Sequence, residues 1–269
     1  AEAHLAAKFN RENFPITDHY TYGIVSDGDL MEGVSQEAAS LAGHLDLGKI
    51  IYLYDANEIS IDGSTDLAFT EDVEQRFKAN QWHTVSVDGH DRKAVEEAVE
   101  ESQSVTDKPS LIICYTHIGF GSPNKQDSSA SHGSPLGEEE IHMTKEKLGW
   151  NYGEKFFIPD EVLQHFRQAR EAGAEYNQEW KDLLEEYKQE YAAQADQFEV
   201  AINRQLPPNF ESFLPEFEAD EAGMATRASS GKVIQKLSAN IPQLIGGSAD
   251  LTGSNKTWMD DAGIFSSSN

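Results

Sequence analysis

The stretch Tyr20-Thr21-Tyr22-Gly23-Ile24-Val25-Ser26-Asp27-Gly28-Asp29 decides the fold class of this chain. Its first six residues are rich in aromatic and β-branched side chains, which predict a short strand over residues 20–25. The small and acidic residues that follow predict a turn. A helical pattern then covers residues 32–45, and the apolar residues of its one face are Val34, Ala38, Leu41, Ala42 and Leu45. A strand, a turn and a helix in this order begin a βαβ unit.

Further strands and helices alternate downstream of this stretch. Strands are expected at residues 50–54, 83–87 and 110–115, and helices at residues 72–79 and 92–102. Residues 50–54 are almost continuously apolar, as expected of a strand that is covered on both faces. The alternation predicts an α/β fold, in which helices flank a parallel sheet.

The rest of the chain predicts a linker and a second unit. Residues 119–137 form a long Gly/Ser/Pro-rich loop, and residues 159–204 have a helical composition. We assign residues 1–204 to an α/β domain with a helical extension, residues 205–223 to an acidic linker and residues 224–269 to the start of a second α/β domain. In this last part we expect a helix at 229–240 and a strand at 243–245. Because the chain starts inside a helical pattern and ends after a motif-rich region, we expect an internal piece of a longer protein.

Composition and charge exclude several classes of partner. The 269 residues include 47 Asp and Glu against 21 Lys and Arg, a formal net charge of −26, which argues against binding to nucleic acid or an anionic membrane. No run of eighteen apolar residues and no signal peptide is visible, so we expect no membrane span and a cytoplasmic protein. The lone cysteine, Cys114, excludes an internal disulfide and a Cys-rich zinc site, and its apolar neighbours predict a buried, inert thiol.

Two strand ends carry matching polar groups. Asp27-Gly28 follows the first strand, and Asp55-Ala56-Asn57 follows the next. Ligands of parallel sheets bind at the carboxyl ends of the strands, and carboxylate and amide oxygens suit Mg²⁺ or Ca²⁺. Gly28 leaves room for a phosphate near a backbone N–H, and the helix that follows would present its positive end. The pattern predicts a metal–diphosphate site, with simple turn capping by Asp27 and Asn57 as the alternative.

The motifs around these residues carry a family resemblance. Ser26-Asp27-Gly28 followed by Asp55-Ala56-Asn57 resembles the thiamine diphosphate fingerprint. The longer segments resemble the transketolase family over nearly the whole chain, apart from weak similarity between about residues 165 and 222. They are Asp27-Gly28-Asp29-Leu30-Met31-Glu32-Gly33-Val34-Ser35-Gln36-Glu37-Ala38, Leu41-Ala42-Gly43-His44, Asn57-Glu58-Ile59-Ser60-Ile61-Asp62-Gly63, Ile118-Gly119-Phe120-Gly121-Ser122-Pro123-Asn124-Lys125, Ser131-His132-Gly133, Leu148-Gly149-Trp150, Ala225-Thr226-Arg227 and Gly246-Gly247-Ser248-Ala249-Asp250-Leu251-Thr252-Gly253-Ser254-Asn255.

The resemblance implies roles for individual residues. Asp27, Asn57 and the carbonyl of Ile59 would hold a divalent cation, Mg²⁺, Ca²⁺ or another, and Gly28 and Asn57 would lie at the diphosphate. His132 would be the catalytic residue that contacts cofactor and substrate, although a His in such a loop is otherwise most often solvated. The remaining assignments are Asp250 near the thiazolium ring of a cofactor held by the partner subunit, Arg227 and Ser254 on the substrate phosphate, and Glu32 and Glu37 at a subunit interface.

The function that the resemblance implies is ketol transfer. A homodimeric transketolase of the pentose phosphate pathway moves a two-carbon unit between ketose and aldose phosphates through a thiamine diphosphate adduct. Residues 1–204 would then be its diphosphate- and metal-binding domain, and residues 224–269 the start of its pyrimidine-binding domain. Dihydroxyacetone synthase and a non-catalytic cofactor-binding piece stay open as alternatives. A nicotinamide-dependent dehydrogenase is disfavoured because no strand end carries a Gly-x-Gly-x-x-Gly turn.

The sequence departs from the family fingerprint at two positions. Ser26 and Ala56 stand where the fingerprint usually has Gly and Asn or Asp. The histidines of the family's N-terminal part and the glutamate that contacts the aminopyrimidine are outside this sequence, so the piece alone is expected to be inactive. Since the ligands are anions, we expect the negative charge to lie away from the site, mostly on residues 138–222.

Overall fold

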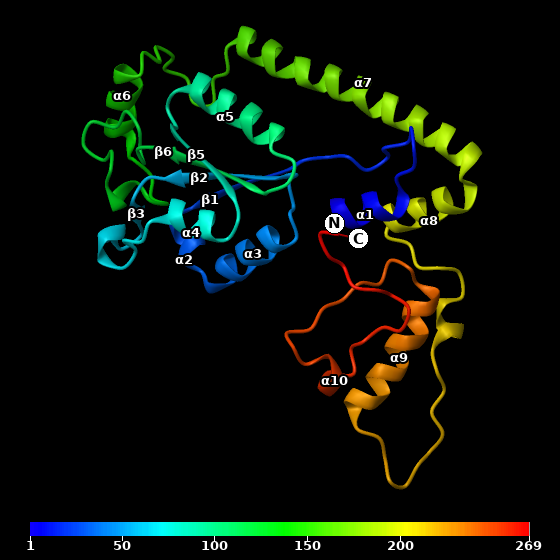
Figure 1. The fold of residues 1–269 in the computed structure, drawn as a ribbon. Coiled ribbons are helices and arrows are strands. Elements are labelled where there is room, and N and C mark those ends of the chain that lie inside the picture. Colours follow the sequence, from blue (N-terminus) through cyan, green and yellow to red (C-terminus); the bar gives the residue numbers. More distant parts are fainter. Residues whose placement is uncertain (269) are drawn as a thin grey trace.

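A computed structural model describes residues 1–268, and its centre is a four-stranded parallel sheet (Figure 1). The strands are β1 (Thr21–Ser26), β2 (Ile50–Ala56), β5 (His83–Asp88) and β6 (Ser110–Tyr115), in the spatial order β1-β2-β6-β5. All four strands and their parallel direction agree with the prediction. The α/β class is therefore confirmed.

The register of the sheet places the carboxyl ends of its four strands at the same height. Ser26 pairs with Asp55, Asp55 with Cys114, and Cys114 with Val87. The loops that follow β1, β2, β6 and β5 therefore leave the sheet along one edge, which is where ligands of parallel sheets bind.

Helices cover both faces of the sheet. On one face, α3 (Gly33–His44) and α4 (Val73–Ala79) bury a cluster that includes Tyr54, Leu111 and Ile113. On the other face, Ala98 of α5 (Arg92–Ser104) packs on Ile51, Ile112 and Cys114. Alternate residues of β2 and β6 thus enter different clusters, which explains their continuous apolar runs. Cys114 is buried, as expected, and burial raises the pKa of its thiol.

The start of the first helical region differs from the prediction. The expected turn at Asp27 is a short helix, α2 (Asp27–Met31), and the chain bends at Glu32 before α3 begins. Of the predicted apolar face of α3, Ala42 is buried, but Val34 and Leu41 are 70% and 57% exposed. Ala39 and Gly43, which were not predicted, are buried with Ala42. A Cβ at Gly43 would lie 1.8 Å from the carbonyl oxygen of Asn80, so the close approach selects the face with small residues.

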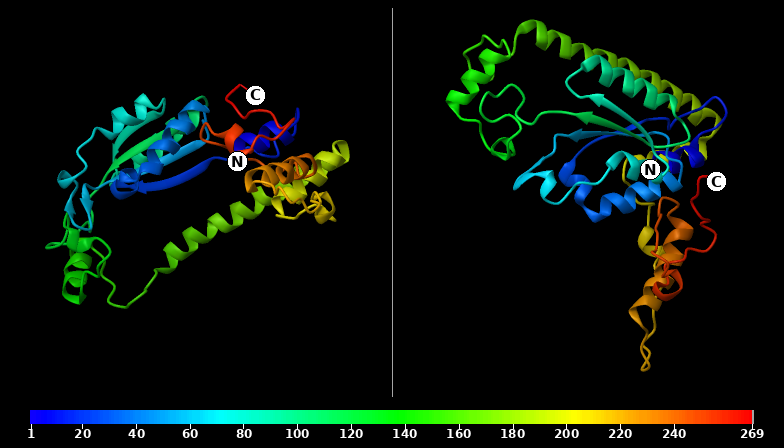
Figure 2. Two further views of the ribbon diagram at one scale, coloured as in Figure 1. Left: turned by 90° about the horizontal axis from the view of Figure 1, so that it is seen from below. Right: turned by 60° about the vertical axis from the view of Figure 1, so that its left-hand side comes forward.

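A second apolar cluster packs the N-terminal helix against the helices of residues 160–202. Phe9 of α1 (Glu2–Phe9) packs between α7 (Asp160–Glu190) and α8 (Ala192–Ile202), and the Tyr187 hydroxyl donates to the Phe9 carbonyl at 2.7 Å. The predicted helix over 159–204 is therefore two helices, which separate at Tyr191. Figure 2 shows α7 spanning the distance between α6 (Glu138–Lys147) and α8.

The C-terminal part contains helices and loops. Its elements are η3 (Phe210–Phe213), α9 (Thr226–Asn240) and α10 (Thr252–Asn255). The strand expected at 243–245 is wrong: these residues are irregular, because no strand of the described residues lies beside them to complete a ladder. The division at residues 204 and 223 stays a prediction.

The smaller elements lie in the connections. A hairpin of β3 (Ile59–Ser60) and β4 (Gly63–Ser64) follows β2 and leads to η1 (Thr65–Leu67), and η2 (Ser129–Ser131) lies in the long loop before α6. None of the helices in residues 1–268 has the length and apolar character needed to cross a membrane.

Candidate functional site at the carboxyl edge of the sheet

Asp27 is a buried carboxylate at the end of β1. Ser26 caps α2 through a capping box with Asp29, which starts the helix at Asp27. The Asp27 side chain is 3% exposed, and its Oδ1 accepts a hydrogen bond from the Tyr54 hydroxyl at 2.5 Å. Its Oδ2 accepts from the backbone N–H of Glu58 at 3.0 Å. These two donors orient the carboxylate toward the end of β2.

Tyr54 is a permanent donor to this carboxylate. Burial, and secondly the hydrogen bond to Asp27, raise the pKa of the Tyr54 phenol well above its ordinary value. The phenol therefore stays protonated over the whole physiological range, and its proton is directed at Asp27.

Asn57 is held by hydrogen bonds to residues of β2 and β3. Its Oδ1 accepts from the Ile59 N–H at 3.1 Å, and its Nδ2 donates to Asp55 Oδ2 at 3.2 Å. Asp55 is in turn hydrogen-bonded by the Thr116 hydroxyl, which follows β6. This network fixes which atom of the Asn57 amide is the acceptor and holds the side chain at the sheet edge.

The structure brings Asp27 to the segment that contains Asn57 and Ile59. The link is the hydrogen bond from Glu58 N, because Glu58 lies between these two residues. A carboxylate offers about four acceptor positions and an amide oxygen two, so both side chains keep free lone pairs beyond the bonds described here. Carboxylate and amide oxygens are ligands that hard cations prefer.

Gly28 lies beside this group in an open position. A Cβ built on Gly28 would meet no atom within 4 Å, so the protein leaves space over this backbone. The helix that follows is only the five residues of α2, and the long α3 starts at Gly33. The helix end beside Gly28 is therefore that of the short α2 and not that of the helix expected from residue 32, and the open backbone of Gly28 fits an anionic group here.

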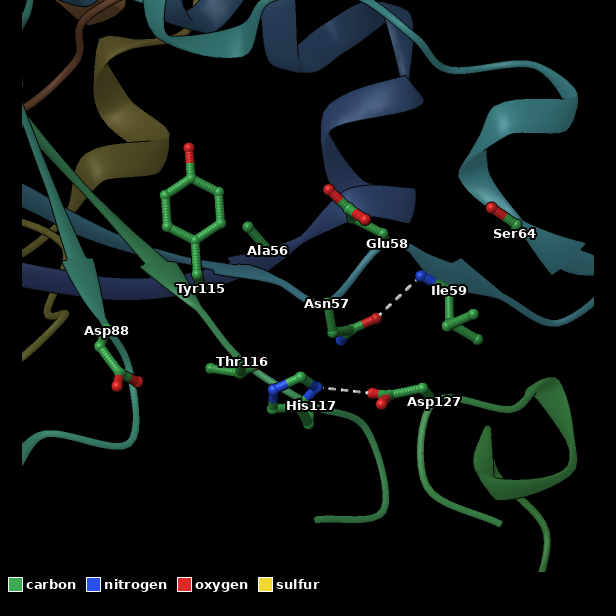
Figure 3. A pocket seen from close by; sticks show the side chains of 10 residues that line it. All are labelled: Ala56, Asn57, Glu58, Ile59, Ser64, Asp88, Tyr115, Thr116, His117 and Asp127. Carbon is green, nitrogen blue, oxygen red and sulfur yellow. Dashed lines mark hydrogen bonds and ion pairs between the residues drawn. The ribbon is translucent and has the colours of Figure 1, made fainter. Parts of the chain in front are cut away.

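A cavity of about 590 Å³ opens at the same edge (Figure 3). Its lining comes from the ends of β2, β5 and β6 and the loops after them: Ala56, Asn57, Glu58, Ile59, Ser64, Asp88, Tyr115, Thr116, His117 and Asp127. Glu58, Asp88 and Asp127 are acidic, and these ten residues include no Lys or Arg. These three residues depart from the expectation that the negative charge lies away from the site, but they are three of the 47 acidic residues of the chain. Carboxylates accumulate here because polar residues that end parallel strands share one edge, and such a lining suits a cation.

Sequence reasoning missed a pair of histidines on this edge. His90 and His117 stack with ring centroids 5.6 Å apart, and Phe120 stacks on His90 at 4.0 Å. His117 Nδ1 lies 2.9 Å from Asp127 Oδ1. Although burial acts in the opposite direction, hydrogen bonds from His117 and Gln126 lower the pKa of Asp127. The rule that selected Asp27 and Asn57 would have found both histidines, because each follows the carboxyl end of a strand.

His132 is not part of the cavity lining, although Asp127, five residues before it, is. It follows η2 and is half-buried, and its ring Nδ1 is buried without a hydrogen-bond partner among the described residues. Such an orphaned polar atom costs stability, so it is consistent with a ligand group that would pair with it.

The other predicted residues lie elsewhere. Arg227, Asp250 and Ser254 are exposed in the C-terminal part, which Figures 1 and 2 show well apart from the ends of β2 and β6. Glu32 and Glu37, at the start of α3, are exposed. Within one chain the structure thus brings Asp27 and Gly28 to the segment of Asn57 and Ile59, and separates them from the C-terminal part that contains Arg227, Asp250 and Ser254.

Comparison with known proteins places the chain in a family. Residues 1–207 match the family "Transketolase, thiamine diphosphate binding domain". A transketolase of Halalkalibacterium halodurans is 49% identical over 267 residues, which are 99% of this chain and 40% of the relative. Transketolases of Leishmania mexicana and of Pichia stipitis, the latter in complex with sedoheptulose-7-phosphate, superpose with TM-scores of 0.92 and 0.91 at 43% identity. The superpositions cover 99% and 97% of this chain, but 40% and 39% of those chains. The chain thus spans about 40% of the length of the relatives it matches, and within that span it belongs to the transketolase family.

Proposed function

We propose that this chain is part of a transketolase, which transfers a two-carbon ketol unit from a ketose phosphate to an aldose phosphate. Relatives with 49% identity are transketolases, and one matched structure holds a sugar phosphate. No relative described above is a dihydroxyacetone synthase. The pentose phosphate pathway and the cytoplasm are the setting in which we expect this activity.

The observation that carries the proposal is the hydrogen bond between Glu58 N and Asp27 Oδ2. It joins the ends of two neighbouring parallel strands and brings Asp27, next to the open backbone of Gly28, to the segment of Asn57 and Ile59. Asp27, Asn57 and the Ile59 carbonyl would hold a divalent cation, and Gly28 would lie at the diphosphate that this cation binds.

Thiamine diphosphate, when bound, supplies the carbon nucleophile for ketol transfer. The residues of this chain would bind the cofactor and orient it. The acidic cavity would attract the cation, Tyr54 and Glu58 N keep Asp27 in place, and His132 would offer its unpartnered Nδ1 to the cofactor or substrate. The chemistry itself needs groups beyond this chain, so the activity belongs to the full-length protein.

The test is the Asp27→Ala variant of the full-length protein. We expect loss of Mg²⁺–thiamine diphosphate binding by calorimetry and loss of ketol transfer, while the thermal unfolding of the apoprotein shows that the fold is kept. Asp62→Ala, an exposed acid in the turn between β3 and β4, is the matched control and should behave as wild type. Normal turnover by the Asp27→Ala variant would refute the assignment of Asp27 as a metal ligand. Binding without turnover in the wild type would instead indicate a non-catalytic module.

We further propose a homodimer in which each active site combines two subunits. Arg227, Asp250 and Ser254 belong to the C-terminal part with α9 and α10, which Figures 1 and 2 show apart from the helix α2 that begins at Asp27, and this supports the arrangement. Arg227 and Ser254 would bind the substrate phosphate, the former through its guanidinium fork, and Asp250 would lie near the cofactor held by the other subunit.

A further inference from the structure

Glu140 is a buried carboxylate that the proposed function does not use. It is the third residue of α6 and 7% exposed, while its neighbours Glu138 and Glu139 are exposed. Burying a carboxylate is costly unless hydrogen bonds compensate. A buried acid beside two solvated ones therefore calls for a structural or functional reason.

Both oxygens of Glu140 bind the loop that follows β6. Oε1 accepts from the Ser122 hydroxyl and from Asn124 N at 2.8 Å, and Oε2 accepts from Asn124 Nδ2 at 2.9 Å. The Ser122 hydroxyl and then the two Asn124 donors lower the pKa of Glu140 to about 2. Glu140 is thus ionised at neutral pH and ties residues 122–124 to α6.

Lys125 extends this connection toward His132. Its N–H donates to Ser122 Oγ at 3.1 Å, its carbonyl accepts from the Ser131 hydroxyl, and its Nζ donates to the Leu136 carbonyl at 2.8 Å. Ser131 precedes His132 directly, and Leu136 lies four residues after it. Both flanks of His132 are therefore attached to Lys125, and Lys125 is attached through Ser122 to Glu140.

Close packing supports the same arrangement. Gly119 has φ +62°, and a Cβ there would lie 2.6 Å from Ser131 Oγ, so the start of the loop touches the residue before His132. Within residues 1–268 the Nδ1 of the His132 ring has no hydrogen-bond partner, whereas the backbone N–H of His132 donates to the Ser129 carbonyl at 3.0 Å. The position of the imidazole therefore depends on the backbone that these contacts fix.

We infer that Glu140 is a positioning residue for His132, acting through Ser122, Asn124, Lys125 and Ser131. The inference rests on the proposed role of His132 at the cofactor and substrate. Glu140 itself touches neither group; it fixes the loop so that the imidazole does not have to be ordered when the ligand binds.

The test uses the full-length protein with Glu140→Ala, His132→Ala and the double variant. We expect Glu140→Ala to lower kcat/KM for the donor ketose by about 10-fold or more, and the double variant to be no slower than His132→Ala alone. Glu140→Gln keeps an oxygen for Ser122 and Asn124 N, so we expect it to recover most of the activity. Glu139→Ala, the exposed neighbour, is the matched control and should equal wild type.

Hydrogen–deuterium exchange of residues 119–137 provides a readout that does not depend on activity. Exchange should become faster in Glu140→Ala and stay unchanged in Glu139→Ala. If Glu140→Ala does not fold, Ser131→Ala removes the last link before His132 and should give the same coupled loss. The inference is overturned if the losses of kcat/KM in the two single variants multiply in the double variant. It is also overturned if exchange of residues 119–137 is unchanged in Glu140→Ala.

The outcomes also separate this inference from the proposed function. If the wild-type protein shows no ketol transfer, the proposed function is refuted. Hydrogen–deuterium exchange then still tests whether Glu140 holds residues 119–137 in place. An active wild type with an impaired His132→Ala but an unimpaired Glu140→Ala refutes the inference alone.

Discussion

At the scale of single residues, the hydroxyl of Tyr54 decides how Asp27 can act. It donates to Asp27 Oδ1 from within the sheet, so the carboxylate keeps one orientation without any ligand. Groups that orient a metal ligand in this way change affinity for the metal even though they do not touch it.

We therefore expect Tyr54→Phe to weaken Mg²⁺ binding in the presence of thiamine diphosphate by roughly 10-fold to 100-fold. Calorimetric titration of the metal measures this. Tyr52→Phe is the matched control, because Tyr52 lies on the same strand and its hydroxyl makes no hydrogen bond within the described structure. Equal metal affinities of the two variants would contradict the role of Tyr54.

Glu140 leads to a prediction about acid stability. Its pKa falls to about 2 in the folded protein, from an ordinary value of 4.5. A carboxyl group with a depressed pKa stabilises the fold fully above its ordinary pKa and loses this contribution as the pH falls toward the folded value. We expect Glu140→Gln to be less stable than wild type at pH 7, and the two proteins to converge between pH 4.5 and about 2.

Urea unfolding at a series of pH values checks this prediction. Glu139→Gln is the control and should follow wild type throughout. A stability difference between Glu140→Gln and wild type that stays constant down to acid pH would show that the missing charge is not the cause.

At the scale of elements, the packing of α3 depends on Gly43. A Cβ at this position would overlap the Asn80 carbonyl, which lies just after α4. We expect Gly43→Ala to destabilise the protein by about 1–3 kcal/mol, because helix and backbone must move apart. Gly173→Ala, in the exposed middle of α7 with open space around it, should stabilise by about 0.5–1 kcal/mol. Denaturant unfolding measures both, and a stabilising Gly43→Ala would contradict the close packing.

At the scale of the whole molecule, an active site shared between subunits has a sharp consequence. Asp27→Ala and Arg227→Ala should each abolish most activity in a homodimer. A mixed dimer of the two carries both defects in one site and none in the other. Random mixing makes half of the dimers mixed, so we expect about one quarter of wild-type activity to return. No recovery after mixing, with mixed dimers demonstrated by affinity tags, would place both residues in one subunit's site.

The net charge of −26 also acts on the whole molecule. Repulsion between like charges destabilises a compact chain, and salt screens it. We expect the melting temperature to rise between about 0.01 M and about 1 M KCl, as the Debye length falls from about 30 Å to about 3 Å. Sucrose of equal osmolality serves as the uncharged control, and a melting temperature that falls with salt would refute the prediction.

Local sequence patterns determined the four strands, most helices and the positions of Asp27 and Asn57 at strand ends. This was possible because alternation and strand-end polarity are properties of short segments. The pattern placed Ala42 on the buried face of α3 correctly but not Ala39 and Gly43, since that face is selected by contact with Asn80. It also predicted a strand at 243–245 that the structure lacks, because a strand needs a neighbour to pair with.

The sequence by itself thus determined the α/β class, the family resemblance and the donor types at the sheet edge. The tertiary structure alone decided the strand order β1-β2-β6-β5, the hydrogen bond from Tyr54 to Asp27, the acidic lining of the cavity and the attachment of the His132 loop to Glu140. Each of these joins residues on different elements. The physical reason is that such contacts depend on how elements pack in space, and no periodicity within one element encodes them.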